Sequence, residues 1–346
     1  MDHIGIDLHK RSSQICILTS GGELLERRIS TTRESFTATL GQRPKARILI
    51  EASTESEWAA RCLEQLGHEV IVADPNFAPM YAQRTRKVKT DRRDARALAE
   101  ACRLGAYRRA HRTSDAQKHV RAQVAVREAL VQTRCKYVYL AGAFLRREGL
   151  RCASGGPETF PARVARLSLS ETLTEEIAPL LAMVPILTAQ IREADHRLER
   201  LMAEDARARR LCSVPGVGPI TAATFVATID GVERFGGAHQ VEAYLGLVPR
   251  EFSSAERQCR GRITKAGNSR ARWLLVEAAW SILRYKKPET LALRRWAERI
   301  AARRGKRRAA VALARRLAGI MFAMLRDDTV YQPEKLGAGV QRRSAA

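Results

Sequence analysis

The sequence has few acidic residues for its number of basic ones. Of 346 residues, 61 are Lys or Arg and 37 are Asp or Glu, which gives a formal net charge of +24. This balance excludes an ordinary acidic metabolic enzyme as the default class. It favours a polyanionic partner, with nucleic acid as the first candidate. Because 45% of the residues are hydrophobic, the positive charge belongs to a folded body and not to a disordered tail.

Cysteine is scarce and long apolar runs are missing. The seven cysteines are scattered along the chain, which argues against a disulfide framework or a zinc knuckle. The sequence has no run of about 18 apolar residues, and its start, MDHIGIDLHK, carries charges where a signal peptide needs an apolar core. We therefore expect a cytoplasmic, nucleoid-associated protein that does not contact a membrane.

The first part of the chain shows the spacing of an α/β domain. Three runs of alternating apolar residues come first, with Gly21 and Gly22 as a turn between the second and the third, as in an antiparallel meander. Two continuous apolar runs typical of buried parallel strands follow, with helical spacing between and after them. The expected strands are 4–8, 14–19, 23–30, 46–53 and 69–74, and the expected helices are 55–66 and 90–104. This order predicts an α/β ribonuclease H-like domain over residues 1–110.

The middle region, residues 111–205, is predicted to be a helical linker with a coiled coil. Its second half carries an a/d heptad seam: Leu173, Ile177, Leu180, Val184, Leu187, Ile191, Ala194, Leu198 and Leu201. Because Pro179 and Pro185 interrupt this seam, we expect a continuous helix only from Pro185 to Ala203, with a kinked or separate helix before it. The seam fits one face of a bundle helix as well as it fits a coiled coil between subunits.

Four acidic residues stand where the predicted sheet would bring them together. Asp7 ends the first strand and Glu51 the fourth, while Asp91 and Asp94 share one face at the start of a helix. Carboxylates this close repel one another unless cations neutralise them, and hard oxygen ligands suit Mg²⁺ or Mn²⁺. Paired ions of this kind can stabilise the entering and leaving oxygens of phosphoryl transfer. Taken singly, the acids fit a turn cap and ordinary helix N-terminal positions.

Residues 206–335 are expected to form a mostly helical, serine-containing domain, followed by a flexible tail, 336–346. In LCSVPGVGPITAATFVATI, two helical stretches are joined through Gly216 and Gly218, and backbone N–H groups at the start of the second stretch can cradle a phosphate. The segment resembles the helix-hairpin-helix motif, which grips duplex DNA without reading its sequence. A tight turn that binds nothing is the alternative.

A strongly basic stretch follows this turn. It contains Ser253 and Ser254 among cationic side chains that we expect to bind nucleic acid, namely Arg257, Arg260, Arg262 and Lys265. A serine hydroxyl is a poor nucleophile until a base, a metal or an electropositive pocket activates it. On composition alone, the Ser-Ser pair indicates only a turn.

Together these motifs carry a resemblance that covers nearly the whole chain in order. GIDLHK, ILIEAS, KTDRRDARALA, SVPGVGPITA and GLVPREFSSAERQCRGRITKAGNSRARWLLVEAA resemble the DEDD insertion-sequence transposases of the IS110 family. The resemblance implies an N-terminal RuvC-like domain and a C-terminal transposase domain. It also implies a catalytic, metal-binding tetrad, which maps onto Asp7, Glu51, Asp91 and Asp94.

The same resemblance implies a catalytic serine before the G-R-I-T-K motif. Ser254 is our assignment and Ser253 the reserve, because Ala255 stands where similar sequences usually have glycine. Members of the family act as oligomers, so a homodimer or tetramer is expected. They use a structured non-coding RNA, the bridge RNA, to pair with double-stranded donor and target DNA.

The leading hypothesis is a DNA transposase in which Ser254 attacks a backbone phosphate and forms a phosphoserine intermediate. Such an intermediate keeps the phosphodiester energy, and the sequence contains no G-x-x-x-x-G-K-[ST] loop for ATP. Two alternatives stay open. One is a RuvC-like junction nuclease that hydrolyses DNA with metal-bound water and uses no serine. The other is a non-catalytic nucleic-acid-binding protein in which the acids are structural.

Overall fold

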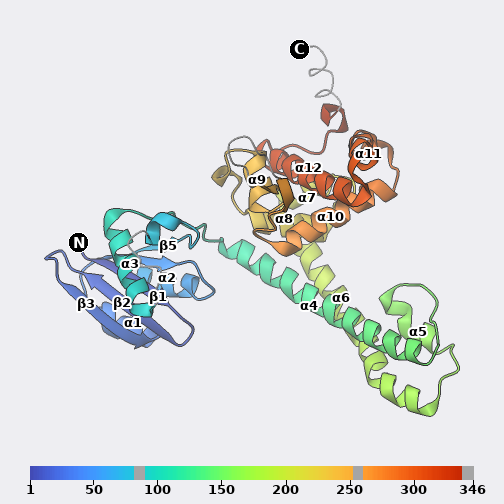
Figure 1. Cartoon of the computed structure of the whole chain (residues 1–346), viewed down its shortest axis with the longest axis horizontal. Coiled ribbons are helices and arrows are strands. Elements are labelled where there is room, and N and C mark those ends of the chain that lie inside the picture. Colours follow the sequence, from blue (N-terminus) through green and yellow to red (C-terminus); the bar gives the residue numbers. More distant parts are fainter. Residues whose placement is uncertain (82–89, 252–259, 337–346) are drawn as a thin grey trace, which may run out of the picture. The chain divides into compact units, whose positions relative to one another are not determined.

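The computed structural model describes residues 1–81, 90–251 and 260–336. The chain forms two compact units, Met1–Thr113 and Ser114–Ala346 (Figure 1). All but the first residue of the predicted tail, 336–346, lies outside the described residues.

The N-terminal unit is built on a five-stranded mixed sheet with the strand order β3-β2-β1-β4-β5. β1 pairs antiparallel with β2, and β2 with β3, so the predicted meander is confirmed. β1, β4 and β5 are parallel neighbours. The bounds are β1 His3–Leu8, β2 Ser12–Leu18, β3 Leu24–Ser30, β4 Arg47–Glu51 and β5 Glu69–Ala73.

Helices cover both faces of this sheet (Figure 1). α1 (Arg33–Leu40) and α2 (Ser56–Gln65) pack on one face, where Ile4, Ile6 and Ile48 are buried against them. α3 (Asp91–Leu104) packs on the other face, against Leu49 and Ile71. Residues of β4 and β5 are therefore buried on both sides, which explains their continuous apolar runs. A 3₁₀ turn, Ala78–Tyr81, follows β5.

The second unit is mostly helical, with one two-stranded sheet. Its two longest helices, α4 (Asp115–Arg147) and α6 (Glu171–Glu204), pack side by side (Figure 1). The other helices are α5 Phe160–Val164, α7 Ala206–Leu211, α8 Pro219–Ile229, α9 Ala238–Tyr244, α10 Ser269–Arg284, α11 Leu291–Arg304 and α12 Lys306–Arg326. The strands are β6 Pro249–Glu251 and β7 Arg260–Ile263, and 3₁₀ turns occur at Pro157–Thr159, Val232–Arg234, Pro288–Thr290 and Pro333–Leu336. A mixed sheet followed by a mostly helical chain is compatible with the ribonuclease H-like order expected from the sequence.

The prediction of a separate helix before Pro185 is wrong, because α6 is one continuous helix that contains both Pro179 and Pro185. Each proline removes one helical N–H and crowds the carbonyl one turn earlier. Both prolines are exposed, so water can bond the carbonyls that they free. The apolar face, with Ile177, Val184 and Leu187 buried, packs along α4 and holds the helix together.

α6 is also long and apolar enough, by length and composition, to cross a membrane. The seam residues Leu173, Ile191, Ala194 and Leu198 are buried in the structure, whereas only 28% of the apolar window of α6 is buried. The cysteines of the described ranges are free thiols, in line with the scattered spacing.

Candidate active site

The carboxyl ends of β1 and β4 place two of the predicted acids side by side. In this parallel pair Ile6 lies opposite Ile50, so Asp7 and Glu51 are the next residues on neighbouring strands. Side chains alternate between the two faces of a sheet. Asp7 therefore shares a face with Gly5, and Glu51 shares it with Leu49, which is buried against α3.

α3 brings the other two acids to the same face. Thr90 caps this helix, its hydroxyl accepting a hydrogen bond from the N–H of Arg93, and Asp91 and Asp94 lie in the first turn. The helix backbone lies directly on β1 at Gly5, where an added Cβ atom would stand 2.2 Å from both Ala95 O and Ala99 N. Only glycine permits this approach, which holds the start of α3 against the carboxyl end of β1.

Replacing Gly5 with alanine is expected to lower the free energy of unfolding by about 1–3 kcal/mol, because α3 must move off the sheet to admit one methyl group. The direction of the change in unfolding free energy is informative, because replacing glycine with alanine stabilises a strand where there is space for the methyl group. Urea denaturation measures the effect. Gly21→Ala is the matched control, because an added Cβ there approaches nothing closer than Thr19 Oγ1 at 3.9 Å. Equal stability of the two variants would contradict the packing argument.

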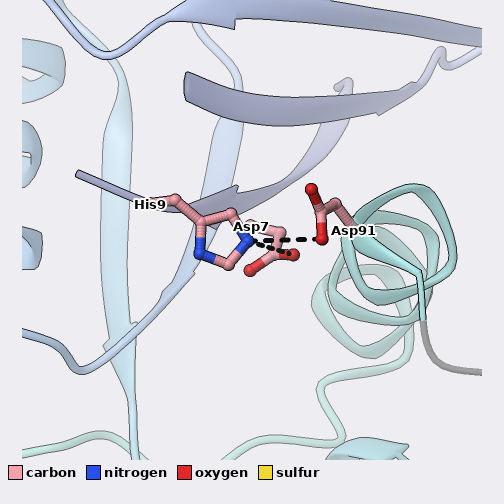
Figure 2. Close-up of side chains that lie close together, drawn as sticks. All are labelled: Asp7, His9 and Asp91. Carbon is pink, nitrogen blue, oxygen red and sulfur yellow. Dashed lines mark ion pairs between the residues drawn. The ribbon is translucent and has the colours of Figure 1, made fainter. Parts of the chain in front are cut away.

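His9 completes a cluster that the sequence analysis missed. Its Nε2 atom lies 3.3 Å from Asp7 Oδ2 and 3.4 Å from Asp91 Oδ1, so one ring nitrogen faces both carboxylates (Figure 2). The alternation of Gly5, Asp7 and His9 in the sequence could have revealed it. Alternate residues of a strand lie on one face, so if the strand continues to His9, all three residues lie on the face that α3 covers.

Asp7 is the electrostatic centre of this group. Burial is the largest cause of the raised pKa of its carboxyl group, His9 acts against the shift, and Asp94, Asp91 and Glu51 each raise the pKa further. The other three predicted acids therefore each lie within electrostatic range of Asp7, and Asp94 is 7% exposed. Four carboxylates in one place favour the binding of a cation.

The donor atoms fit a hard divalent cation. One ligand atom each from Asp7, His9 and Asp91 lie within 4.8 Å of one another. Among the residues that the structure describes, this group includes His9 in place of the predicted Glu51 and Asp94. Carboxylate oxygens dominate the set, as Mg²⁺ and Mn²⁺ prefer.

The predicted serine nucleophile belongs to a separate part of the chain. Ser253, Ser254 and Arg257 lie outside the described residues. The segments on either side form the ribbon of β6 and β7, in which Glu251 pairs with Arg260. Arg262 lies on β7.

Lys265 follows this ribbon in a left-handed conformation, with a φ of 59°. Its N–H donates to Gly246 O at 3.1 Å, which ties the end of the ribbon to the turn after α9.

The predicted glycine turn joins α7 to α8, as expected. Gly216 has a φ of +85°, and a Cβ atom there would stand 2.9 Å from Ala278 O, so this glycine also serves packing against α10. Gly218 caps α8 without a side-chain hydrogen bond. Both glycines line a cavity of about 350 Å³ that is bordered by Tyr285 and Lys287. Backbone N–H groups at the start of a helix, next to a lysine, suit a phosphate.

Comparison with known proteins agrees with these features. A family model of DEDD type, described as a transposase, matches residues 4–147, and a model described as the transposase IS116/IS110/IS902 family matches residues 208–294. A probable family 20 transposase of Pseudomonas aeruginosa is 31% identical, over 96% of this chain and 99% of that protein. The chain belongs to the IS110/IS116 family of transposases.

Two further relatives of this transposase are encoded by insertion sequences. It is 30% identical to the transposase for insertion sequence element IS1328 of Yersinia enterocolitica, over 95% of this chain and 98% of that protein. It is 27% identical to the transposase for insertion sequence element IS1111A of Coxiella burnetii, over 95% of this chain and 91% of that protein.

The two family models divide the candidate residues of the transposase between them. The first spans the acids and His9, and the second spans the glycine turn and the basic ribbon. A DNA substrate follows from membership in the family. Membership also suggests the use of a divalent metal, for which the cluster of Asp7, His9 and Asp91 is a candidate ligand group.

Proposed function

We propose that this transposase cleaves and rejoins DNA strands through a covalent phosphoserine intermediate formed by Ser254. A divalent-metal site made of Asp7, Glu51, Asp91 and Asp94, on a ribonuclease H-like sheet of RuvC type, assists the reaction. The observation that carries the proposal is the convergence of these acids at the carboxyl ends of β1 and β4 in a member of a transposase family.

The proposed chemistry balances without an energy donor. The Ser254 hydroxyl oxygen bonds to the phosphorus of a backbone phosphodiester, and the bond from that phosphorus to one deoxyribose oxygen breaks. A base takes the hydroxyl proton, and the leaving oxygen gains one. The phosphoserine diester keeps the energy of the broken bond. A DNA hydroxyl can therefore attack it in the reverse sense, restore a phosphodiester and free the serine without ATP.

The proposed role of the acids is to bind metal cations next to the reacting phosphate. Divalent cations bound there, Mg²⁺ or Mn²⁺, would stabilise the developing charge on the attacking and leaving oxygens. The burial of Asp7 and Asp94 supports this role, because buried carboxylates need a counter-charge. Thr90 and Gly5 fix the start of α3 and so orient Asp91 and Asp94.

Nucleic acid is held by basic groups and backbone amides of the second unit. We assign the DNA backbone to the turn at Gly216 and Gly218, and further phosphates to Arg257, Arg260, Arg262 and Lys265. The net charge of +24 supports contact with more than one nucleic-acid strand. On the family resemblance we include a bridge RNA as guide, a homo-oligomer, dimer or tetramer, as the acting species, and the nucleoid as its location.

The test is a strand-cleavage assay with the full chain. The protein is purified together with its co-purifying RNA, which is sequenced, and is mixed with end-labelled duplex DNA from the regions that flank its coding sequence. We expect cleavage in Mg²⁺ or Mn²⁺ and none in EDTA. A fraction of the cleaved strands should migrate freely on a denaturing gel only after protease treatment.

Each other outcome selects another function. Metal-dependent cleavage that leaves only free DNA ends would replace the proposal with a nuclease that uses water. Tight DNA binding with no cleavage in either metal, with the RNA present, would replace it with a non-catalytic nucleic-acid-binding protein. Cleavage that persists in EDTA would remove the role of the acids.

A further inference from the structure

Two hydrogen bonds fix the backbone of His9. Its N–H donates to Ser12 O at 3.3 Å, and its carbonyl accepts from Thr31 Oγ1 at 2.7 Å. The first bond continues the β1–β2 ladder by one residue beyond Leu8, and the second joins His9 to the residue that follows β3. The imidazole therefore stands on the same face as Asp7, two residues earlier.

The distances around His9 Nε2 match those between neighbouring ligands of one ion. Ligand atoms about 2.1 Å from an octahedral ion stand about 3 Å apart when adjacent. Nε2 lies 3.3 Å from Asp7 Oδ2 and 3.4 Å from Asp91 Oδ1, so a small contraction brings both oxygens to this spacing from the nitrogen (Figure 2). The ligand atoms of the three residues all lie within 4.8 Å of one another. The side chains of His9 and Asp91 are about half exposed, at 51% and 48%, which leaves room for the ion and for substrate oxygens.

We propose that His9 is a direct ligand of the divalent cation at the acid site, an inference that rests on the metal site of the proposed function. With Asp7 and Asp91 it forms a mixed nitrogen and oxygen ligand group on one side of the ion. A nitrogen ligand favours Mn²⁺ over Mg²⁺, because Mg²⁺ prefers an all-oxygen shell. The site thus binds Mn²⁺ more tightly than four carboxylates alone account for.

Electron spin-echo spectroscopy of the full chain loaded with Mn²⁺ tests this ligand directly. Nitrogen bound to Mn²⁺ modulates the echo decay, so we expect ¹⁴N modulation in the wild-type protein and none in His9→Gln. His3→Gln is the matched control, since His3 begins the same strand, about 13 Å from Asp7 along β1. This control should keep the modulation.

Titration with Mn²⁺ and Mg²⁺ gives a second readout that needs no DNA. His9→Gln should weaken Mn²⁺ binding by about tenfold and Mg²⁺ binding by less, whereas Asp7→Asn should weaken both. Circular dichroism of each variant verifies that it is folded.

The possible outcomes test the His9 ligand separately from the metal site on which this inference rests. Mn²⁺ that binds in an Asp7-dependent way without ¹⁴N modulation overturns the His9 ligand and leaves the metal site standing; His9 then only pairs with the two carboxylates. Mn²⁺ binding that is insensitive to Asp7→Asn overturns both. Modulation that survives in His9→Gln assigns the nitrogen to another residue and also overturns the inference.

Discussion

Asp7→Asn is expected to abolish strand cleavage while DNA affinity stays within about twofold of the wild type. Asp7 is the most buried member of the cluster around His9, and the substitution removes the charge that holds the cation while keeping the shape. Metal ions supply several kcal/mol at the transition state, and every 1.4 kcal/mol is a factor of ten, so the rate should fall at least about a thousandfold. Glu51→Gln should behave in the same way. Single-turnover cleavage and filter binding measure the two quantities.

Asp74→Asn is the matched control for this prediction. Asp74 directly follows β5, the strand next to β4, so it lies near the same end of the sheet. Its carboxylate is already satisfied, because Oδ2 accepts a hydrogen bond from Arg108 and Oδ1 accepts one from the N–H of Asn76. Cleavage by Asp74→Asn should therefore stay near the wild-type rate. Near-wild-type cleavage by Asp7→Asn or Glu51→Gln would refute the metal-site assignment.

The sheet could be predicted because its strands carry strong local signals. Alternating runs and a Gly-Gly turn specify the meander, and continuous apolar runs specify β4 and β5, which helices cover on both faces. The strand order, in which β4 lies next to β1 and not next to β3, was predicted from the ribonuclease H-like order of these elements. The positions of Asp7 and Glu51 are consequences of that order, since both follow directly on the paired residues Ile6 and Ile50.

Features that depend on packing across the chain could not be predicted in this way. The continuity of α6 through Pro179 and Pro185 depends on which side of the helix is buried, and the sequence pattern of the seam does not by itself weigh that burial against two lost hydrogen bonds. His9 was missed because it lies just past the strand. Only the hydrogen bonds to Ser12 and Thr31 show that the strand geometry continues to it.

Ser254→Ala is expected to remove the covalent protein–DNA adduct completely, because alanine has no oxygen to form the ester with phosphorus. Rejoining should disappear with the adduct. Metal binding should be unchanged, since the acids and His9 belong to the N-terminal unit. A Ser254→Ala protein that still binds Mn²⁺ and DNA but forms no adduct therefore separates the chemistry of the serine from that of the metal site.

Ser253→Ala is the matched control, since it removes an adjacent hydroxyl from the same basic stretch and should retain at least part of the adduct. Mass spectrometry of the DNA-modified peptide identifies the residue that carries the phosphate. An adduct on Ser253 would move the nucleophile by one residue and leave the mechanism intact. Full cleavage by Ser254→Ala with free DNA ends would instead mean that water is the nucleophile. The acids would then be sufficient for catalysis, and the basic ribbon around β7 would only bind nucleic acid.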